Sequence, residues 1–142
     1  MKALALSNGD LVVGSQGHSM VTGSSKIRQD MALALGEPLG EDRFHTQWGS
    51  VLPSYIGSPL TDDVEALVRA EVSRVLSNYI AVRDEYILED RLTGSGSRFD
   101  SSDVVSSVDS ISAKVDEDSI RVSVVLTTLA GTKIKINRTV QT

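Results

Sequence analysis

The chain of 142 residues has no cysteine and few aromatic residues. Without cysteine it can form neither disulfides nor thiolate zinc sites, which is typical of proteins kept in a reducing compartment. The two histidines are His18 and His45, and neither lies in a metal-ligand spacing such as H-E-x-x-H. We therefore expect no metal site.

Long apolar runs are missing as well. Four apolar residues, 3–6, follow Met1-Lys2, and this run is too short for the core of a signal peptide. No run approaches the roughly 20 residues that a membrane-spanning helix needs. A net charge of -5 disfavours sequence-independent binding to phosphate backbones. We expect a protein made in a cytoplasm, with neither a membrane nor a nucleic acid as its partner.

The length corresponds to one domain, which we expect to span residues 1–142. Near the N-terminus, short apolar runs flank Asn8-Gly9. An Asn-Gly pair in this setting is typical of a hairpin, because both residues tolerate the positive φ of a type I′ turn. The sequence predicts a small N-terminal β-hairpin.

Two amphipathic helices are predicted next. The first begins at Ser24 or Ser25, which can cap its free amides, and ends at Gly36, two residues before Pro38. The second begins at Thr61-Asp62-Asp63, where side-chain oxygens and negative charge suit a helix N-terminus. Its apolar stripe consists of Val64, Leu67, Val68, Val72, Val75, Leu76 and Tyr79.

From residue 86 onward the period of the apolar residues falls toward two. We predict a first strand over 86–92, a loop over 95–102, and either strand or a helical turn over 103–108. Regular alternation at 111–115, 120–126 and 134–140 then indicates an antiparallel meander. The expected class is α+β, with an N-terminal β-hairpin and two amphipathic helices packed on a C-terminal, mainly antiparallel sheet.

The sequence offers no convincing catalytic set. A glycosidase needs two carboxylates facing a sugar, one of them with a raised pKa. Glu37, Glu41 and Asp42 are close together, but little apolar sequence surrounds them, and solvated turn charges are the better interpretation. The segment 94–97 lacks both the Gly-x-Ser-x-Gly elbow and the dinucleotide fingerprint. We expect no catalytic residue and no cofactor.

Two segments are candidates for contact with other proteins. Trp48 and Tyr55 lie where the sequence has no clear period, so they either fill the domain's own core or anchor a neighbour. The last predicted strand carries Lys133, Lys135 and Arg138 between apolar residues. These basic residues either protect an exposed sheet edge or belong to an edge that accepts a partner strand, and the sequence leaves both alternatives open.

Residues 29–55 carry the most informative pattern of the chain. Gln29 and Leu33 lie on the first predicted helix, Gly40-Glu41 follows it, and Trp48-Gly49-Ser50 and Leu52 come next. In this order and spacing the chain resembles the W-type baseplate wedge proteins of contractile-tailed phages, a family once called lysozyme-like and also known as sheath initiators. The resemblance extends over most of the chain.

The resemblance implies a structural protein of the tail baseplate in the virion. Such a protein joins wedge subunits around the tube, in multiple copies in a ring, and templates sheath assembly by offering edge strands. The implied partners are other baseplate wedge proteins and the tail sheath protein, with tube or hub proteins as further candidates. The residues expected to contact partners are Gln29, Gly40, Glu41, Trp48, Tyr79, Ile134 and Ile136.

One departure from the family pattern concerns the second helix. The family commonly carries Glu-Pro-Arg just after it, and the best placement in this sequence is Ser77-Asn78-Tyr79. The Thr that usually precedes the Gly-Glu turn is replaced by Glu37. Two other functions stay open, a small lysozyme-like glycan hydrolase of the tail and a generic cytoplasmic adaptor domain.

Overall fold

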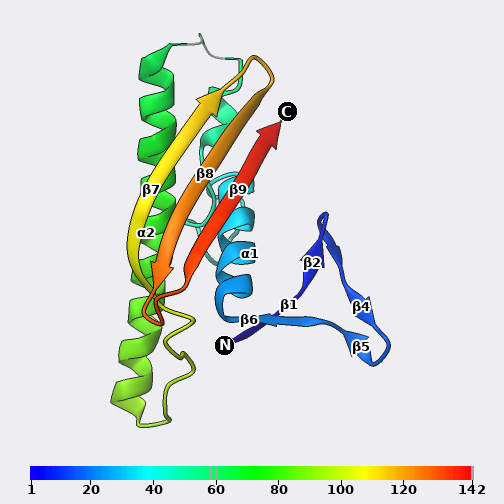
Figure 1. Ribbon diagram of the computed structural model, residues 1–142, viewed down its shortest axis with the longest axis vertical. Helices are drawn as coiled ribbons and strands as arrows, with labels where there is room; N and C mark the ends of the chain where they lie inside the picture. The colour runs from blue at the N-terminus through cyan, green and yellow to red at the C-terminus, as the bar shows by residue number, and fades with distance from the viewer. Residues whose placement is uncertain (58, 60, 142) are drawn as a thin grey trace.

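The computed structural model describes residues 1–57, 59 and 61–141. Three long antiparallel strands form a sheet, and two helices cover one of its faces (Figure 1). A small unit of short strands projects beside the first helix. The predicted α+β class is therefore confirmed.

The sheet has the order β7-β8-β9, with β7 at Val105–Val115, β8 at Ser119–Thr128 and β9 at Lys133–Gln141. The predicted meander is confirmed, since both pairings are antiparallel. Period-2 alternation turns one set of side chains toward the helices. The buried members of this set are Val115, Ile120, Val122, Val124, Leu126, Ile134, Ile136 and Val140.

Helix α2 spans Asp62–Thr93, so it begins where the sequence predicted, directly after Thr61. The strand predicted over 86–92 is wrong, because these residues form the last turns of α2. No glycine or proline interrupts 62–93, and Glu, Arg, Leu and Ala favour helix throughout it. Gly94 ends the helix in the left-handed conformation, with φ of 66°.

The length of α2 also corrects the placement of the family motif. Ser77-Asn78-Tyr79 lies in the middle of α2 and cannot occupy a position after that helix. The segment that follows α2, residues 94–104, contains no Glu-Pro-Arg. Its Asp103 is buried, with 4% of its surface exposed.

Helix α1 spans Gly23–Gly36, and its predicted end at Gly36 is confirmed. The predicted capping by Ser24 or Ser25 is wrong, because the helix begins before them and the N-cap, Thr22, makes no side-chain capping bond. Asp103 supplies the acceptor instead, since its Oδ1 accepts a hydrogen bond from the Gly23 amide at 3.1 Å. A carboxylate suits this position, because free amides give a helix N-terminus partial positive charge.

The N-terminal unit is more elaborate than the single predicted hairpin. Strand β1 (Lys2–Leu4) pairs with β6 (Met20–Thr22), and two short hairpins branch from this stem, β2 (Leu6–Ser7) with β3 (Asp10–Leu11) and β4 (Val13–Gly14) with β5 (Gly17–His18). The predicted Asn8-Gly9 turn is confirmed by φ values of 53° and 83°.

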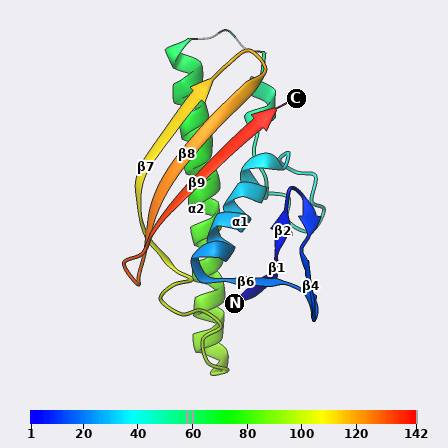
Figure 2. The ribbon, with the colours of Figure 1, turned by 45° about the vertical axis from the view of Figure 1, so that its right-hand side comes forward.

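A closed ring of three backbone hydrogen bonds joins the stem to the two hairpins. The Ala5 amide donates to the Ser19 carbonyl at 2.8 Å, the Ser19 amide to the Val12 carbonyl at 2.9 Å, and the Val12 amide to the Ala5 carbonyl at 3.0 Å. We call residues 2–22 the N-terminal arm. Figure 2 shows it beside α1, away from the sheet.

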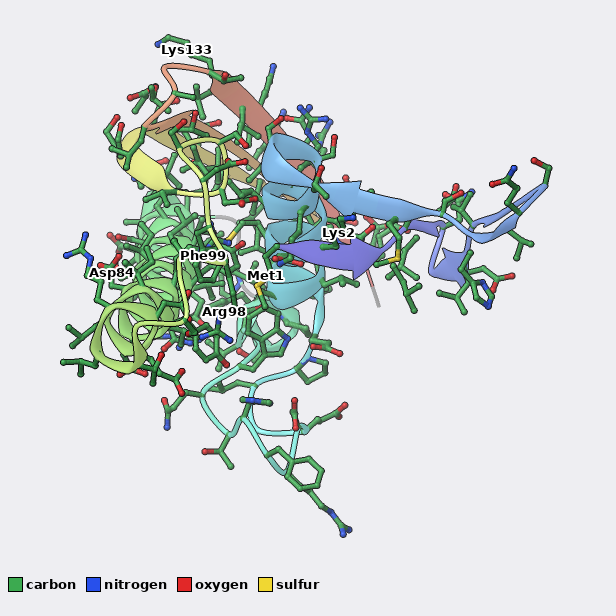
Figure 3. The ribbon with its side chains drawn as sticks, turned by 90° about the horizontal axis from the view of Figure 1, so that it is seen from below. Met1, Lys2, Asp84, Arg98, Phe99 and Lys133 are labelled. Atoms are coloured by element: carbon green, nitrogen blue, oxygen red, sulfur yellow. The ribbon has the colours of Figure 1, made fainter. Side chains whose placement is uncertain are left out.

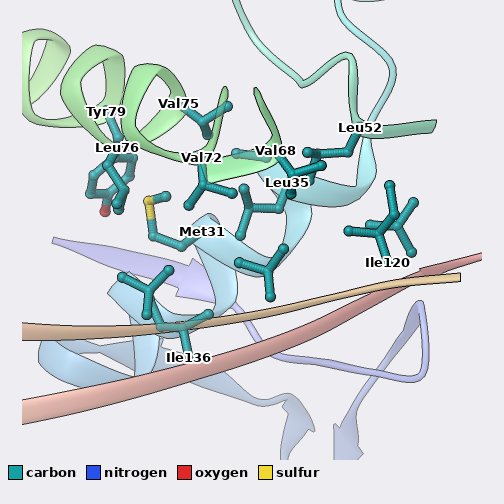
Figure 4. Close-up of a cluster of buried hydrophobic side chains, with 14 of the residues drawn as sticks. Met31, Leu35, Leu52, Val68, Val72, Val75, Leu76, Tyr79, Ile120 and Ile136 are labelled. Atoms are coloured by element: carbon teal, nitrogen blue, oxygen red, sulfur yellow. The ribbon is translucent and has the colours of Figure 1, made fainter. Parts of the chain in front are cut away.

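The core lies between the helices and the sheet. Met31 and Leu35 of α1, both fully buried, lie near Val72 of α2 and Ile136 of β9 (Figure 4). Leu52, at the start of the 3-10 helix η1 (Leu52–Tyr55), closes one end of the core. In the part of the chain that the structure describes, no helix is both long and apolar enough to cross a membrane.

Between α1 and η1 the chain forms a loop whose two ends are tied together. The Leu39 amide donates to the Ser50 carbonyl at 3.0 Å, and the Ser50 amide donates to the Glu37 carbonyl at 2.7 Å. Gly40 and Gly49 within this loop have φ values of 85° and 98°. Both positions therefore need glycine, because other residues are strained at such φ values.

The two glycines are expected to differ in how strongly they resist substitution. Gly40→Ala should lower the free energy of unfolding by about 1 kcal/mol, the usual cost of backbone strain. Gly49→Ala should cost about 3 kcal/mol, because the new Cβ would also lie 2.7 Å from the carbonyl oxygens of Glu37 and Pro38. Urea unfolding of both variants measures the difference, and equal losses would show that the close approach at Gly49 is unimportant.

Candidate functional site

The loop over residues 37–51 is held against α2 by one ion pair. Glu71 and Arg74 pair at 2.7 Å, the Glu71 carboxylate accepts from the Val51 amide at 2.9 Å, and Arg74 donates to the Gly49 carbonyl at 2.9 Å. Ser50 Oγ adds a bond to the Leu35 carbonyl of α1 at 2.7 Å. The pair thus fixes the segment that follows Trp48.

Glu71 is nearly buried, with 9% of its surface exposed. Burial by itself would raise the pKa of the carboxyl group, but the bonds from Arg74 and the Val51 amide, with the charge of Arg74, lower the pKa by more. The net pKa lies below the ordinary value of 4.5. Glu71 therefore stays ionised at neutral pH.

Trp48 lies partly inside and partly on the surface. Its ring packs against the core, and its indole Nε1 donates to the Glu37 carboxylate. Tyr55 likewise packs against the core as a partly buried residue. Both alternatives considered for Trp48 therefore keep structural support, since a half-buried ring both fills the core and offers an exposed edge.

The tip of the loop is organised by Asp42. Its carboxylate accepts from the Phe44 amide at 2.8 Å and from the His45 amide at 3.3 Å, and it contacts His45 Nδ1 at 3.1 Å. These bonds lower the pKa of Asp42, and the bond from the Phe44 amide has the largest effect. The acceptor of these amide bonds is thus Asp42 and not the adjacent Glu41. Phe44 is left 91% exposed.

A groove of about 570 Å³ lies between this loop and the two helices. Figure 3 shows the sheet above, the helices in the middle and the loop below them, so the groove lies on the side of the helices away from the sheet. Asn78 of α2 ties the loop to the helix through a bond to the Gln47 carbonyl at 3.2 Å. The groove is lined by Met1, Lys26, Asp30, Asp42, Phe44, His45, Thr46, Gln47, Trp48, Asn78, Tyr79, Val82, Arg83, Tyr86 and Phe99.

A polar chain crosses the floor of the groove from α1 to α2. The Asp30 carboxylate accepts from Lys26 and, at 2.9 Å, from the Tyr79 hydroxyl, which in turn accepts from Arg83. Burial and the neighbouring charge of Asp30 raise the pKa of Tyr79. Tyr79, predicted as a contact to partners, is thus 8% exposed and occupied within the molecule.

Gln29, another predicted contact residue, has a defined task within the chain. Its side-chain amide donates to the Leu4 carbonyl at 2.8 Å and accepts from the Leu6 amide at 2.9 Å. These two bonds clip the N-terminal arm to α1 by imitating one step of a β-ladder. A contact of Gln29 with another protein would have to use the side-chain atoms that these two bonds leave exposed.

Ile134 and Ile136 were predicted at a surface for partners, but their side chains are 0% and 1% exposed. Their backbone amides and carbonyls also point toward β8 and not toward the open edge. Thr128 donates to the Thr132 carbonyl at 3.0 Å, and hydrogen-bonded pairs alternate along an antiparallel ladder, so the groups of Ile134 and Ile136 point to β8. The outward groups of β9 belong to residues 133, 135, 137, 139 and 141.

The arrangement gives no support to glycan hydrolysis. Of the carboxylates at the groove, Asp30 is bonded to Lys26 and Tyr79, and Asp42 has a lowered pKa. A glycosidase acid needs a raised pKa, which Asp42 does not have, and the Asp30 carboxylate is engaged by Lys26 and Tyr79. Among the described residues no three His, Cys, Asp or Glu side chains are grouped as a metal site would need.

Comparison with known proteins supports the fold. No family model and no curated protein matches the sequence. A crystal structure from Geobacter sulfurreducens, of a protein described provisionally as a tail lysozyme, matches with a TM-score of 0.59. The match covers 93% of this chain and 96% of that one, with 13% sequence identity. At this identity the likeness establishes a shared fold.

Sequence reasoning missed Glu71, Arg83 and Asp103. Glu71 and Asp103 have partners in distant segments, the Val51 amide and the Gly23 amide, whereas Arg83 bonds to Tyr79 of its own helix. A weak signal was available for two of them. Glu71 and Arg83 fall next to, or in step with, the apolar stripe of α2, where a charged residue is expected to be buried with a partner.

The Glu71–Arg74 pair predicts how stability depends on pH. The pKa of Glu71 is lower in the folded than in the unfolded state, so its contribution is complete above pH 4.5 and is lost as pH falls through the folded pKa. Glu71→Gln should cost about 2 kcal/mol at pH 7 and progressively less below pH 4. Denaturant titrations of both proteins between pH 3 and pH 7 measure this, and a constant difference would contradict it.

Proposed function

We propose that this protein is a structural component of a phage contractile-tail baseplate wedge. In this role it joins wedge subunits around the tube and templates sheath assembly by offering a sheet edge. The observation that carries the proposal is the regular, open edge of β9. The fold shared with a protein described as a tail lysozyme, together with the sequence pattern at 29–55, supports the tail setting.

The two edges of the sheet differ in how well they suit strand addition. Edge β7 has register shifts between Val105 and Ser107 and between Val108 and Ser110, and such bulges disturb pairing. Edge β9 pairs with β8 without any shift from Ser119 to Thr127. An extended segment of another protein would therefore find regularly spaced outward amides and carbonyls on β9.

One position on the β9 edge is already occupied. Arg28 of α1 donates from Nε to the Lys135 carbonyl at 3.2 Å, which confirms that this carbonyl faces outward. Residues 137–141 lie farther along the edge. We place the incoming strand there, with Lys135 beside it as a basic residue that selects an acidic segment, since Lys133 already contacts Asp109 at 3.4 Å.

The remaining contacts of the proposal lie away from the sheet. We place the loop with Gly40, Glu41 and Trp48 against other wedge proteins, because this loop exposes Phe44 and lies on the side of the helices away from the sheet. An arrangement with binding surfaces on two sides suits a joint between subunits. In the virion, copies arranged in a ring would present one β9 edge each to the sheath protein.

The alternative of a tail glycan hydrolase is tested directly. We expect purified protein to leave peptidoglycan intact, since Glu41 is exposed, Asp30 is engaged by Lys26 and Tyr79, and the pKa of Asp42 is lowered. Release of muropeptides is measured for the wild type and for Asp30→Asn, Glu41→Gln and Asp42→Asn. Turnover that one of these substitutions abolishes would establish the hydrolase instead.

The edge is tested by a proline at an outward-facing position. Asn137→Pro removes an amide that points away from β8, so the sheet should survive while strand addition fails. Asn137→Ala is the matched control, since both variants lose the bond from Ser123 to the Asn137 side chain. Electron microscopy of tails is expected to show baseplates on bare tubes with Asn137→Pro and complete sheaths with Asn137→Ala.

Circular dichroism and thermal unfolding check that both Asn137 variants are folded. Normal sheaths on folded Asn137→Pro protein would eliminate the proposed edge. Proline at Ile136 would be a poorer test, because the Ile136 amide belongs to the ladder with β8 and its side chain to the core.

A further inference from the structure

Arg83 is a buried cation that has no carboxylate partner in the part of the chain that the structure describes. It is 6% exposed, and its guanidinium lies 4.7 Å from the ring centre of Tyr79 and 5.2 Å from that of Phe99. One nitrogen, Nη2, donates to the Tyr79 hydroxyl, whereas the buried Nη1 has no hydrogen-bond partner among the described residues. Buried guanidinium groups are normally paired, so this one needs an explanation.

The lysine at the same groove is already compensated, because Lys26 pairs with Asp30. Tyr79 links Arg83 to Asp30 through its hydroxyl, but this hydroxyl remains neutral and cannot balance the charge of Arg83. Arg83 is therefore the side-chain cation of the groove lining that lacks a carboxylate partner among the described residues.

Several aromatic side chains line the groove. Phe44, Trp48, Tyr86 and Phe99 line it together with Val82, which is 39% exposed. Rings around a guanidinium lower the local dielectric and strengthen its attraction for an anion. An apolar side chain with a carboxylate beside it would match both the walls and the charge.

We propose that this groove binds a carboxylate of a partner protein segment, with Arg83 as the recognising cation and the aromatic residues as the seat of an adjacent apolar side chain. The carboxylate comes either from an Asp or Glu side chain or from a chain terminus. The site is separate from the β9 edge and does not depend on sheath assembly. The competing explanation is one water molecule in the small void of about 10 Å³ that also borders Arg83.

The chain contains one tryptophan, Trp48, and it lines the groove, so its fluorescence reports occupancy. Four capped peptides serve as probes on the whole protein: acetyl-Phe-Asp-Leu-amide, its Asn counterpart, acetyl-Phe-Leu with a free terminus, and acetyl-Phe-Leu-amide. We expect the Asp peptide or the free terminus to bind at least about tenfold more tightly than its uncharged counterpart. Which charged peptide binds identifies the source of the carboxylate.

Substitutions at Val82 test the charge without disturbing the core. Val82→Glu should weaken binding of the charged peptide, and Val82→Lys, a matched variant of similar length, should strengthen it. Arg83→Met should abolish the preference for the charged peptide. If Arg83→Met does not fold, the Val82 pair still decides the outcome.

Three results would overturn the proposal. Equal binding of charged and uncharged peptides would leave the groove as an apolar surface. Unchanged preference in Arg83→Met, or in both Val82 variants, would make Arg83 a structural residue satisfied by water. Absence of any fluorescence change with all four peptides at millimolar concentration would remove the groove as a carboxylate site.

Discussion

The burial of α1 against both the sheet and α2 is the constraint on which the rest of the molecule depends. Met31 and Leu35 are fully buried, so hydrophobic packing fixes the rotation of the helix about its axis. Successive residues then point in directions about 100° apart. Arg28 reaches the β9 edge, Gln29 the N-terminal arm and Asp30 the floor of the groove. One packed helix thereby sets the positions of three separate surfaces.

Electrostatics has a second, more local part in the structure. Buried carboxylates are used as joints between segments distant in sequence, as Asp103 joins the start of α1 and Glu71 joins the loop before η1. Such joints are costly to break, because the loss of one partner leaves a buried charge or amide without compensation. They hold irregular segments that have few apolar residues of their own.

The regular elements were open to prediction because local patterns determine them. Alternation in 111–115, 120–126 and 134–140 arises from the two faces of a strand, and Asn8-Gly9 carries its own conformational preference. The strand expected at 86–92 failed because apolar residues there fit both periods, and helix continuity outweighed the alternation. Helix capping by Asp103 depends on a contact across 80 residues, which no local pattern reveals.

The candidate site was predicted in part for a similar reason. The importance of the Trp48 loop follows from its glycines and aromatic residues, which are local signals. The sequence also located the β9 edge, but the prediction named Ile134 and Ile136, because their apolar alternation is the visible sequence signal. The open amides belong to the residues between and beside them. Arg83 is unpaired because no acceptor of the described residues lies within reach of its Nη1, and this depends on three-dimensional packing that the sequence does not reveal.

The hydrogen-bonded ring of Ala5, Val12 and Ser19 gives the N-terminal arm a modular design. The three residues are spaced seven apart, and each bond of the ring closes at the base of one branch without involving the tips. Either outer hairpin can therefore change in length or sequence while the ring and the stem keep their geometry. In such a unit the stem and the ring serve attachment, and the two hairpin tips are free to diverge. Related chains can therefore acquire different arm tips on an unchanged body.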